Sequence, residues 1–592
     1  MKRISRFFKD FFGNSPPAAI GQRSAIHALV TNSLKELERQ PPSMKDIFLG
    51  QSASGEYIRF GSCFIPIEWT AFHTIYFGAT GAGKTNLLNM QISGVLDTLK
   101  HNPTRRVIIN DYKGDAPAIL KGHGVEYVML SVDYQEGHAP DIAKDFDSYN
   151  QLRQFGFHLI PERNQSDPFW ETASRLVLAG VAQSFFHTQG TNFKLHDFDC
   201  LLQQDFATLL RVLAQCPSNK NIVRFILSEV AEKTSVSVMA NLIAEIGKIS
   251  HASGHSQNVG KYLSVREFLF SQTPPAQVLV ISQRKSTREV TNPLMGIVID
   301  RVIELFLDSP EHRDVYGNEK PPWLYIFNDE LAASGKYKKI REFVSAARSK
   351  GGSAFLATQD VNGLQELYGE KATGSIVGNC NFKVMCSAPL DGVTAQWMAS
   401  FFGEKQYAQL VPSSISSDPK SGEISLSMRL DRFKQQQFTS GDFTSIPLAS
   451  KEIGISAVFH NPINKDSYFD TVEPQLVDEY KRRYFPVSQP TPLSPSMELV
   501  GGWSESERRR FVEPEVSPTR SATHISNDVD LEIFNAAVDV LATLVSANPN
   551  DKIGEVWKRC GAVLEERMIP DLMNMSEAEK QRILAQFNSK EV

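Results

Sequence analysis

The sequence lacks three features that would place it in large classes of protein. No run of about 18 apolar residues occurs in its 592 residues, so we expect no transmembrane helix. Its six cysteines are scattered and form no C-x-x-C pair, which argues against a zinc site or a disulfide framework and fits a reducing compartment. Its formal net charge of −5 excludes a generally basic nucleic-acid coat but allows a local basic groove or channel.

The first twelve residues have the pattern of a basic amphipathic helix. Five apolar residues share one helical face and four basic residues cover the remainder: Ile4, Phe7, Phe8, Phe11 and Phe12, and Lys2, Arg3, Arg6 and Lys9. Such a helix can bind an anionic membrane surface, dock on its own protein or dock on a partner, and these alternatives stay open. Because charged and apolar residues interleave, it is not a signal peptide. We therefore expect a cytoplasmic protein, peripheral at the inner membrane if residues 1–12 bind lipid.

A complete G-x-x-x-x-G-K-[ST] phosphate loop is the most informative feature present. It lies between a β-branched and aromatic stretch at 74–77 and helical apolar spacing at 86–92, the context that such a loop requires. Glycines let backbone N–H groups and the helix N-terminus face an anion. We predict an ATP site in which Lys84 reaches the β- and γ-phosphates and Thr85 ligates Mg²⁺. The predicted nucleotide-binding residues are Gly78, Ala79, Thr80, Gly81, Ala82, Gly83, Lys84, Thr85 and Asn86.

Apolar strands alternate with helical stretches around this loop. Short alternating segments at 46–70 predict a β-hairpin, and further strands are expected at 106–111, 277–282, 323–328, 353–358 and 382–386. This alternation predicts an α/β fold, a P-loop NTPase core with a mainly parallel sheet and helices on both faces. Between about 192 and 262 the apolar spacing stays helical and no strand candidate occurs, which predicts an all-α insertion.

The apolar strand at 323–328 is followed by two adjacent acids, Asp329 and Glu330. Neighbouring side chains at a strand end point in opposite directions and can perform different tasks. We predict that Asp329 belongs to the Mg²⁺ shell and that Glu330 orients and polarises the attacking water. Solvated acids at a strand end are the alternative, but the phosphate loop in the same chain favours the catalytic interpretation.

Two further polar residues are candidates for the catalytic site. Gln359 ends the strand at 353–358, where its amide can sense the γ-phosphate. Arg348 lies on the preceding helix and could enter a neighbouring subunit's site as an arginine finger. A surface salt bridge is the alternative for Arg348.

The composition changes after the sheet. Prolines and serines crowd 486–527 and apolar periodicity is lost, which predicts a flexible linker. Helical spacing returns at 529–592 and predicts a small three-helix module. The predicted organisation is an amphipathic helix and linker at 1–45, the nucleotide-binding domain at 46–188 and 269–460, an all-α inserted domain at 189–268, a C-terminal extension and linker at 461–528, and the helical module at 529–592.

Several ordered segments resemble VirD4/TraD/TraG-type coupling proteins of conjugation and type IV secretion, within the FtsK/HerA group of ATPases. Besides the nucleotide motifs, these segments are His73, 111–115 (DYKGD), 167–171 (DPFWE), 348–351 (RSKG), 358–359 (TQ), 368–369 (YG), 376–379 (IVGN) and 402–403 (FG). The resemblance covers about 46–460. It implies a RecA-like motor, an all-α domain, a homo-hexamer and single-stranded DNA in a central pore. The sequence departs from the family in one respect. Coupling proteins usually begin with transmembrane helices, and no such segment is expected here.

We therefore expect an ATP hydrolase with ATP and Mg²⁺ as cofactors, an ATP-driven translocase that moves DNA or a relaxase–DNA or protein substrate toward a type IV channel. Its grip on single- or double-stranded DNA should be blind to sequence, because pore loops would contact phosphates. Relaxase, adaptor or channel proteins are the expected partners. The alternatives are a soluble pump in repair, segregation or phage defence, and an ATP-binding ring scaffold that recruits partners through its C-terminal module. Intact Lys84, Asp329, Glu330 and Gln359 argue against the scaffold.

Overall fold

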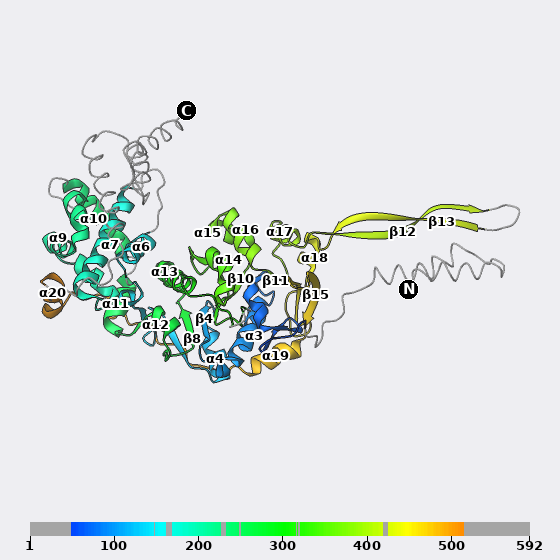
Figure 1. Cartoon of the computed structure of the whole chain (residues 1–592), viewed down its shortest axis with the longest axis horizontal. Coiled ribbons are helices and arrows are strands. Elements are labelled where there is room, and N and C mark those ends of the chain that lie inside the picture. The colour runs from blue at the N-terminus through cyan, green and yellow to red at the C-terminus, as the bar shows by residue number, and fades with distance from the viewer. Residues whose placement is uncertain are drawn as a thin grey trace, which may run out of the picture. The chain divides into compact units, whose positions relative to one another are not determined.

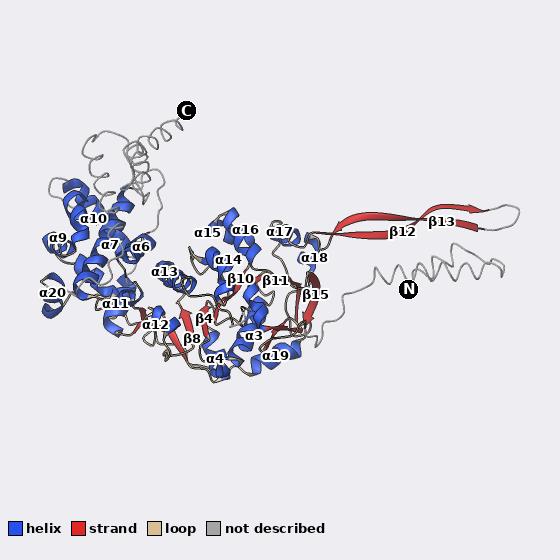
Figure 2. Cartoon of the chain, viewed as in Figure 1, coloured by secondary structure: helices blue, strands red, loops and turns tan. Residues whose placement is uncertain are grey.

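The computed structural model describes residues 49–513, apart from 147, 161–168, 227–231, 248–249, 315–316, 318–319 and 418–423. The predictions for 1–45 and for the module at 529–592 lie outside the described residues. Figures 1 and 2 show the described helices and strands, coloured along the chain and by type. The chain divides into two compact units. The described part of unit 1 comprises 49–98, Asp329–Ala332 and Ala354–Arg483, and that of unit 2 comprises Leu99–Asn328, Ala333–Ser353 and the chain from Tyr484 onward.

Unit 1 contains a mixed run of five strands in the order β15-β14-β11-β3-β10. The strands are β3 (Thr74–Phe77), β10 (Gly352–Thr358, in this unit from Ala354), β11 (Phe382–Met385), β14 (Ile455–Asn461) and β15 (Asp466–Val472). β3 pairs in parallel with β10 and β11, whereas β14 is antiparallel to both of its neighbours. Every residue of β3, β10 and β11 is buried, as the continuous apolar sequence of parallel strands predicts.

The predicted hairpin before the phosphate loop is present, as antiparallel β1 (Tyr57–Phe60) and β2 (Cys63–Pro66). The remaining elements of unit 1 are the 3-10 helix η2 (Ile67–Phe72), α3 (Lys84–Asp97), α15 (Val361–Tyr368), α16 (Glu370–Asn379), α17 (Thr394–Ser400), α18 (Ser440–Ser445) and α19 (Pro474–Arg482). α3 packs against β1 at its one glycine, because a Cβ at Gly94 would lie 3.3 Å from Ile58 Cβ.

A long hairpin in unit 1 was not predicted. β12 (Glu404–Ser417) and β13 (Ile424–Gln436) pair antiparallel with each other and with no other strand of the described chain. The register shifts between Pro412 and Ser414, which is where a β-bulge accommodates the proline.

Unit 2 contains four strands in the order β9-β4-β8-β5, all paired in parallel. They are β4 (Arg106–Asp111), β5 (Tyr127–Leu130), β8 (Val278–Ser282) and β9 (Leu324–Asn328). The other elements near this sheet in the sequence are η3 (Leu99–His101), α4 (Ala116–His123), β6 (Ala139–Pro140), α5 (Ile142–Asp145), α12 (Val265–Phe270), α13 (Arg288–Leu307) and α14 (Ile340–Lys350). The strands expected at 106–111, 277–282 and 323–328 are confirmed to within a residue. The α/β class is confirmed, and the pairings are all parallel in unit 2 and mixed in unit 1.

The helical part of unit 2 is larger than the predicted insertion at 189–268. Its elements are α6 (Tyr149–Leu159), α7 (Phe169–Gln189), α8 (Leu195–Leu202), α9 (Phe206–Ala214), η4 (Pro217–Asn219), the π-helix η5 (Ile222–Ile226), α10 (Glu232–Gly247) and α11 (Ser250–Val259). α7 packs against α6, α9 and α10, so a boundary at 189 would separate this helix from its core. Between 192 and 261 the described residues contain helices and no strand, as expected, and the two-residue β7 (Tyr262–Leu263) pairs with β6 at the end of this range.

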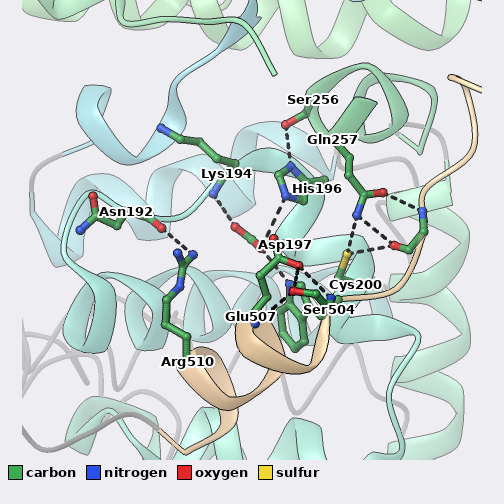
Figure 3. Close-up of polar contacts among 12 residues, drawn as sticks. Asn192, Lys194, His196, Asp197, Cys200, Ser256, Gln257, Ser504, Glu507 and Arg510 are labelled. Carbon is green, nitrogen blue, oxygen red and sulfur yellow. Dashed lines mark hydrogen bonds and ion pairs between the residues drawn. The ribbon is translucent and has the colours of Figure 1, made fainter. Parts of the chain in front are cut away.

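The described part of the predicted linker at 486–527 is docked on unit 2, first on residues 121–136 and from Met497 onward on these helices. Its helix α20 (Glu505–Val512) packs on α7 and α9. Trp503 donates from Nε1 to Asp197 at 2.8 Å and stacks on Phe511 with ring centroids 4.9 Å apart. Figure 3 shows Gln257 and Asp197 of the helical part meeting this segment, beside the bond from Arg510 to Asn192 O at 2.9 Å. The prediction of a flexible linker is therefore wrong up to residue 513.

Candidate nucleotide site

The phosphate loop joins β3 to α3, and its glycines provide backbone conformations that this turn needs. Gly81 has φ +80°, and Gly83, at the N-cap of α3, has φ +93°. Side chains with a Cβ rarely adopt this left-handed region. A Cβ at Gly83 would also lie 2.5 Å from Ile455 Cγ2. The loop therefore packs directly against the start of β14, and only glycine fits there.

Two backbone hydrogen bonds from distant segments hold the loop in place. Ala79 N–H donates to Ser387 O at 2.6 Å, and Ala449 N–H donates to Gly81 O at 3.1 Å. Sequence reasoning missed these supports together with Ile455. No motif could have revealed them, because a backbone carbonyl or N–H can come from almost any residue type.

Lys84 and Thr85, the last two residues of the motif, begin α3. The Lys84 side chain is buried, and its Nζ donates to Gly78 O and, at 3.2 Å, to Ala79 O. The ammonium group therefore lies within the loop. Thr85 Oγ1 donates to Asp329 Oδ1 at 2.8 Å. The motif and the first acid after β9 thus meet in unit 1, although 244 residues separate them in the sequence.

Glu330 is linked back to the phosphate loop through Gln359. Gln359 Nε2 donates to Glu330 Oε2 at 2.9 Å, while Gln359 Oε1 accepts from Thr80 Oγ1 at 2.9 Å. One amide therefore contacts the loop with its oxygen and the second acid with its nitrogen. The O/N assignment of this amide follows from its partners. The ionised carboxylate of Glu330 can only accept, so the amide nitrogen faces it, and the Thr80 hydroxyl donates to the amide oxygen.

Burial sets the protonation of this second acid. Glu330 is mostly buried, and desolvation raises the pKa of its carboxyl above the usual value. The hydrogen bond from Gln359 and the positive charge of Lys84 act in the opposite direction, and the neighbouring Asp329 adds to the rise. The result is a carboxyl poised to exchange a proton closer to neutrality than a solvated glutamate.

The sequence matches a known family. A family model described as the type IV secretion-system coupling protein DNA-binding domain matches residues 58–440. The chain belongs to this family. The coupling protein TraD of Escherichia coli (strain K12) is 24% identical over 374 residues, which is 62% of this chain and 49% of TraD. The chain thus spans about half the length of this curated relative.

Solved structures of another coupling protein, TrwB, share the fold. The unbound bacterial conjugative coupling protein TrwBdeltaN70 has a TM-score of 0.56 at 17% identity, covering 74% of this chain and 91% of TrwBdeltaN70. TrwB in complex with ADP and Mg²⁺ has a TM-score of 0.54 at 17% identity, and the match covers 76% of this chain and 92% of the TrwB chain. The α/β fold of a coupling protein is therefore established for this chain. None of the helices among the described residues is long and apolar enough to cross a membrane.

The hydrogen-bonded cluster of the site consists of Thr80, Lys84, Thr85, Asp329, Glu330 and Gln359. The predicted site residues Asn86 and Arg348 are not part of it. Asn86 is half-buried in the first turn of α3 and forms no hydrogen bond or ion pair with the cluster. Arg348 is exposed on α14 in unit 2, whereas the cluster belongs to unit 1. Its role as an arginine finger stays a prediction.

His73, one of the residues that carried the family resemblance, has a structural role that the sequence did not reveal. It is buried and has φ +56° and ψ 148°, a conformation that costs about 1–3 kcal/mol for a residue other than glycine. Its Nδ1 accepts a hydrogen bond from Ala354 N–H at 3.1 Å. The strained residue thus fixes the start of β3, four residues before the loop, against the start of β10.

Proposed function

We propose that this chain is the ATP-hydrolysing motor of a coupling protein and that it moves DNA toward a type IV secretion or conjugation channel. The observation that carries the proposal is the meeting of Lys84, Thr85, Asp329 and Glu330 in one unit, from two distant parts of the sequence. Membership of a family whose matched domain is described as DNA-binding supports DNA as the cargo.

The donors in the cluster suit magnesium and nucleotide. The Thr85 hydroxyl and the Asp329 carboxylate are hard oxygen ligands 2.8 Å apart, which is the pair that Mg²⁺ prefers at a phosphate loop. When bound, Mg²⁺ would neutralise charge that develops on the β- and γ-phosphate oxygens. Lys84 would exchange its two carbonyl partners for phosphate oxygens. The TrwB complex with ADP and Mg²⁺ supports the same ligands on the same fold.

Glu330 would hold the attacking water and receive its proton. A water bound to this carboxylate would lie within reach of the loop, because Gln359 connects Glu330 to Thr80. The same amide would sense the nucleotide, since movement at Thr80 changes its oxygen contact and thereby the orientation of Glu330. Arg348 would complete the site of a neighbouring subunit if the chain forms the proposed homo-hexamer.

DNA-dependent ATP hydrolysis tests the proposed function. We expect oligo(dT) or duplex DNA to stimulate the ATPase rate, with little dependence on sequence and a strong decrease at high salt, because a pore would contact phosphates. The measurement is a coupled ATPase assay with each DNA across a salt series. Equal rates with and without both DNAs would remove DNA transport and leave the ring scaffold as the better interpretation.

The pH profile of hydrolysis tests the assignment of Glu330. Its raised pKa predicts that kcat/KM for ATP falls as the pH is lowered, with a midpoint above the usual glutamate value of 4.5. Gln359→Ala removes the hydrogen bond that lowers this pKa, so the midpoint should move to still higher pH. The exposed Asn362→Ala is the control and should leave the midpoint in place. A midpoint that Gln359→Ala leaves unmoved would assign the acid limb to another group.

A further inference from the structure

Unit 2 contains a cavity of about 640 Å³ that the nucleotide site does not use. It lies where the parallel strands β4, β8 and β5 end, and its walls come from the turn after β4, the segment after β8 and residues 487–490. Ligands of open α/β sheets bind outside the carboxyl ends of the strands, and the volume is in the range of small-molecule sites. The position and the size of the cavity are therefore those of a ligand site.

Four basic residues line this cavity: Lys113, Arg284, Lys285 and Arg288. The side chains of Arg284 and Lys285 form no ion pair or hydrogen bond within the described part of the chain. Arg288 is buried and lies over the Tyr112 ring at 3.8 Å, and it donates from Nη2 alone, to Tyr112 O and Gln283 O. Most of the donors of these guanidinium groups are therefore available to a ligand.

The two acids of the lining accept hydrogen bonds from other groups and form no ion pair with Arg284, Lys285 or Arg288 within the described part of the chain. Asp111 accepts from the N–H groups of Gly114, Asp115 and Ala116 at 2.8–3.1 Å, so it orders the turn after β4. Glu136 accepts from Thr491 N–H and Oγ1 at 2.9 and 2.7 Å. Four cations against two committed carboxylates leave the cavity with an excess of two positive charges.

Three tyrosines complete the lining: Tyr112, Tyr127 and Tyr134. Each is only partly buried, so ring surface faces the cavity or solvent. Aromatic rings beside the Arg284 guanidinium and the Lys285 ammonium group are the combination that binds nucleotide units, because the cations contact phosphate and a ring stacks on the base.

We propose that this cavity binds phosphate groups of nucleotide chemistry, with Arg284 and Lys285 as the phosphate contacts and a tyrosine ring against the attached nucleoside. Two sources share this chemistry: the internucleotide phosphates of a single strand and the phosphates of a free nucleotide. The first deepens the proposed function, on which it rests, because it places part of the DNA grip in unit 2. The second is a nucleotide site separate from Lys84.

Binding of labelled oligo(dT) by the full chain tests the first source. Each phosphate contact to a single strand contributes about 0.7 to the slope of log K against log salt, so Arg284→Ala/Lys285→Ala should reduce the slope by about 1.4 and weaken binding roughly 25-fold near 0.1 M salt. The matched control is Lys481→Ala/Arg482→Ala, which also removes one lysine and one arginine, here from exposed positions on α19. Arg284→Lys/Lys285→Arg retains both charges and should restore the slope, which a merely structural effect would not.

A fluorescent ATP analogue tests the second source in a Lys84→Ala background. Residual binding that Arg284→Ala/Lys285→Ala abolishes would assign the cavity to free nucleotide. If the Lys84→Ala chain binds no analogue and the slope for oligo(dT) is unchanged in the cavity variant, the proposal is wrong while DNA transport stands. If the unaltered chain binds no oligo(dT), DNA transport fails instead, and the cavity is judged by the analogue alone.

Discussion

Glu330→Gln is expected to bind ATP as tightly as the unaltered chain but to hydrolyse it on the order of 10²–10⁴ times more slowly. The amide keeps the shape of the side chain and can still contact Gln359, so the loop, Lys84 and the Thr85–Asp329 bond are preserved. It cannot accept the proton of the attacking water. Single-turnover hydrolysis and equilibrium binding of a fluorescent ATP analogue separate the two effects.

The control for this variant is Glu366→Gln, which makes the same change at an exposed position on α15. Its hydrolysis rate should match that of the unaltered chain. A Glu330→Gln chain with an unchanged rate would show that another group accepts the proton, and a chain that no longer binds the analogue would show that Glu330 supports the loop instead.

Trp503→Ala is expected to release the segment 493–513 from the helical part of unit 2. The Trp503 side chain is 9% exposed and stacks on Phe511, and its ring centroid lies 6.3 Å from that of Phe185. Its truncation therefore removes a large apolar contact and the hydrogen bond to Asp197. Such truncations cost about 3–5 kcal/mol, which corresponds to an increase of more than about 100-fold in the undocked population. Limited proteolysis measures this increase as faster cleavage between residues 493 and 513.

Phe485→Ala is the comparison for this experiment. Phe485 belongs to the same stretch of chain, but its side chain is 54% exposed, so its loss should leave the cleavage rate almost unchanged. If the two variants are cut at the same rate as the unaltered chain, the stacked rings do not hold the segment, and the backbone contacts around Gln257 and Asn258 must hold it.

The sequence predicted those parts of the fold in which one strand or one loop carries its own signal. Buried parallel strands are apolar throughout, so β3, β4, β8, β9 and β10 were found. Asp329, Glu330 and Gln359 were found because they stand where such strands end. β12 was not predicted because it contains Pro412 and several serines. A strand tolerates proline only where one of its sides is unpaired or where it has a bulge, as β12 does here.

The docked segment shows a second limit of composition. Prolines and serines correctly indicate that little regular structure forms between 484 and 504, but they do not exclude specific contacts. Met497, Leu499 and Gly501 dock through their backbone carbonyls, which accept from Asn258 and Gln257. A backbone carbonyl leaves no trace in hydrophobic periodicity, so composition alone mistakes such a segment for a tether.

The contact of Gly83 with Ile455 has a practical consequence for anyone who shortens this chain. Every motif residue of the site lies between 78 and 359, and the family match ends at 440. A fragment that stopped there would keep all the recognisable chemistry but would lose Ala449, which bonds the loop, and Ile455, against which it rests. Its failure to bind nucleotide would then reflect a missing scaffold, so truncations intended to isolate the motor should extend at least through β15.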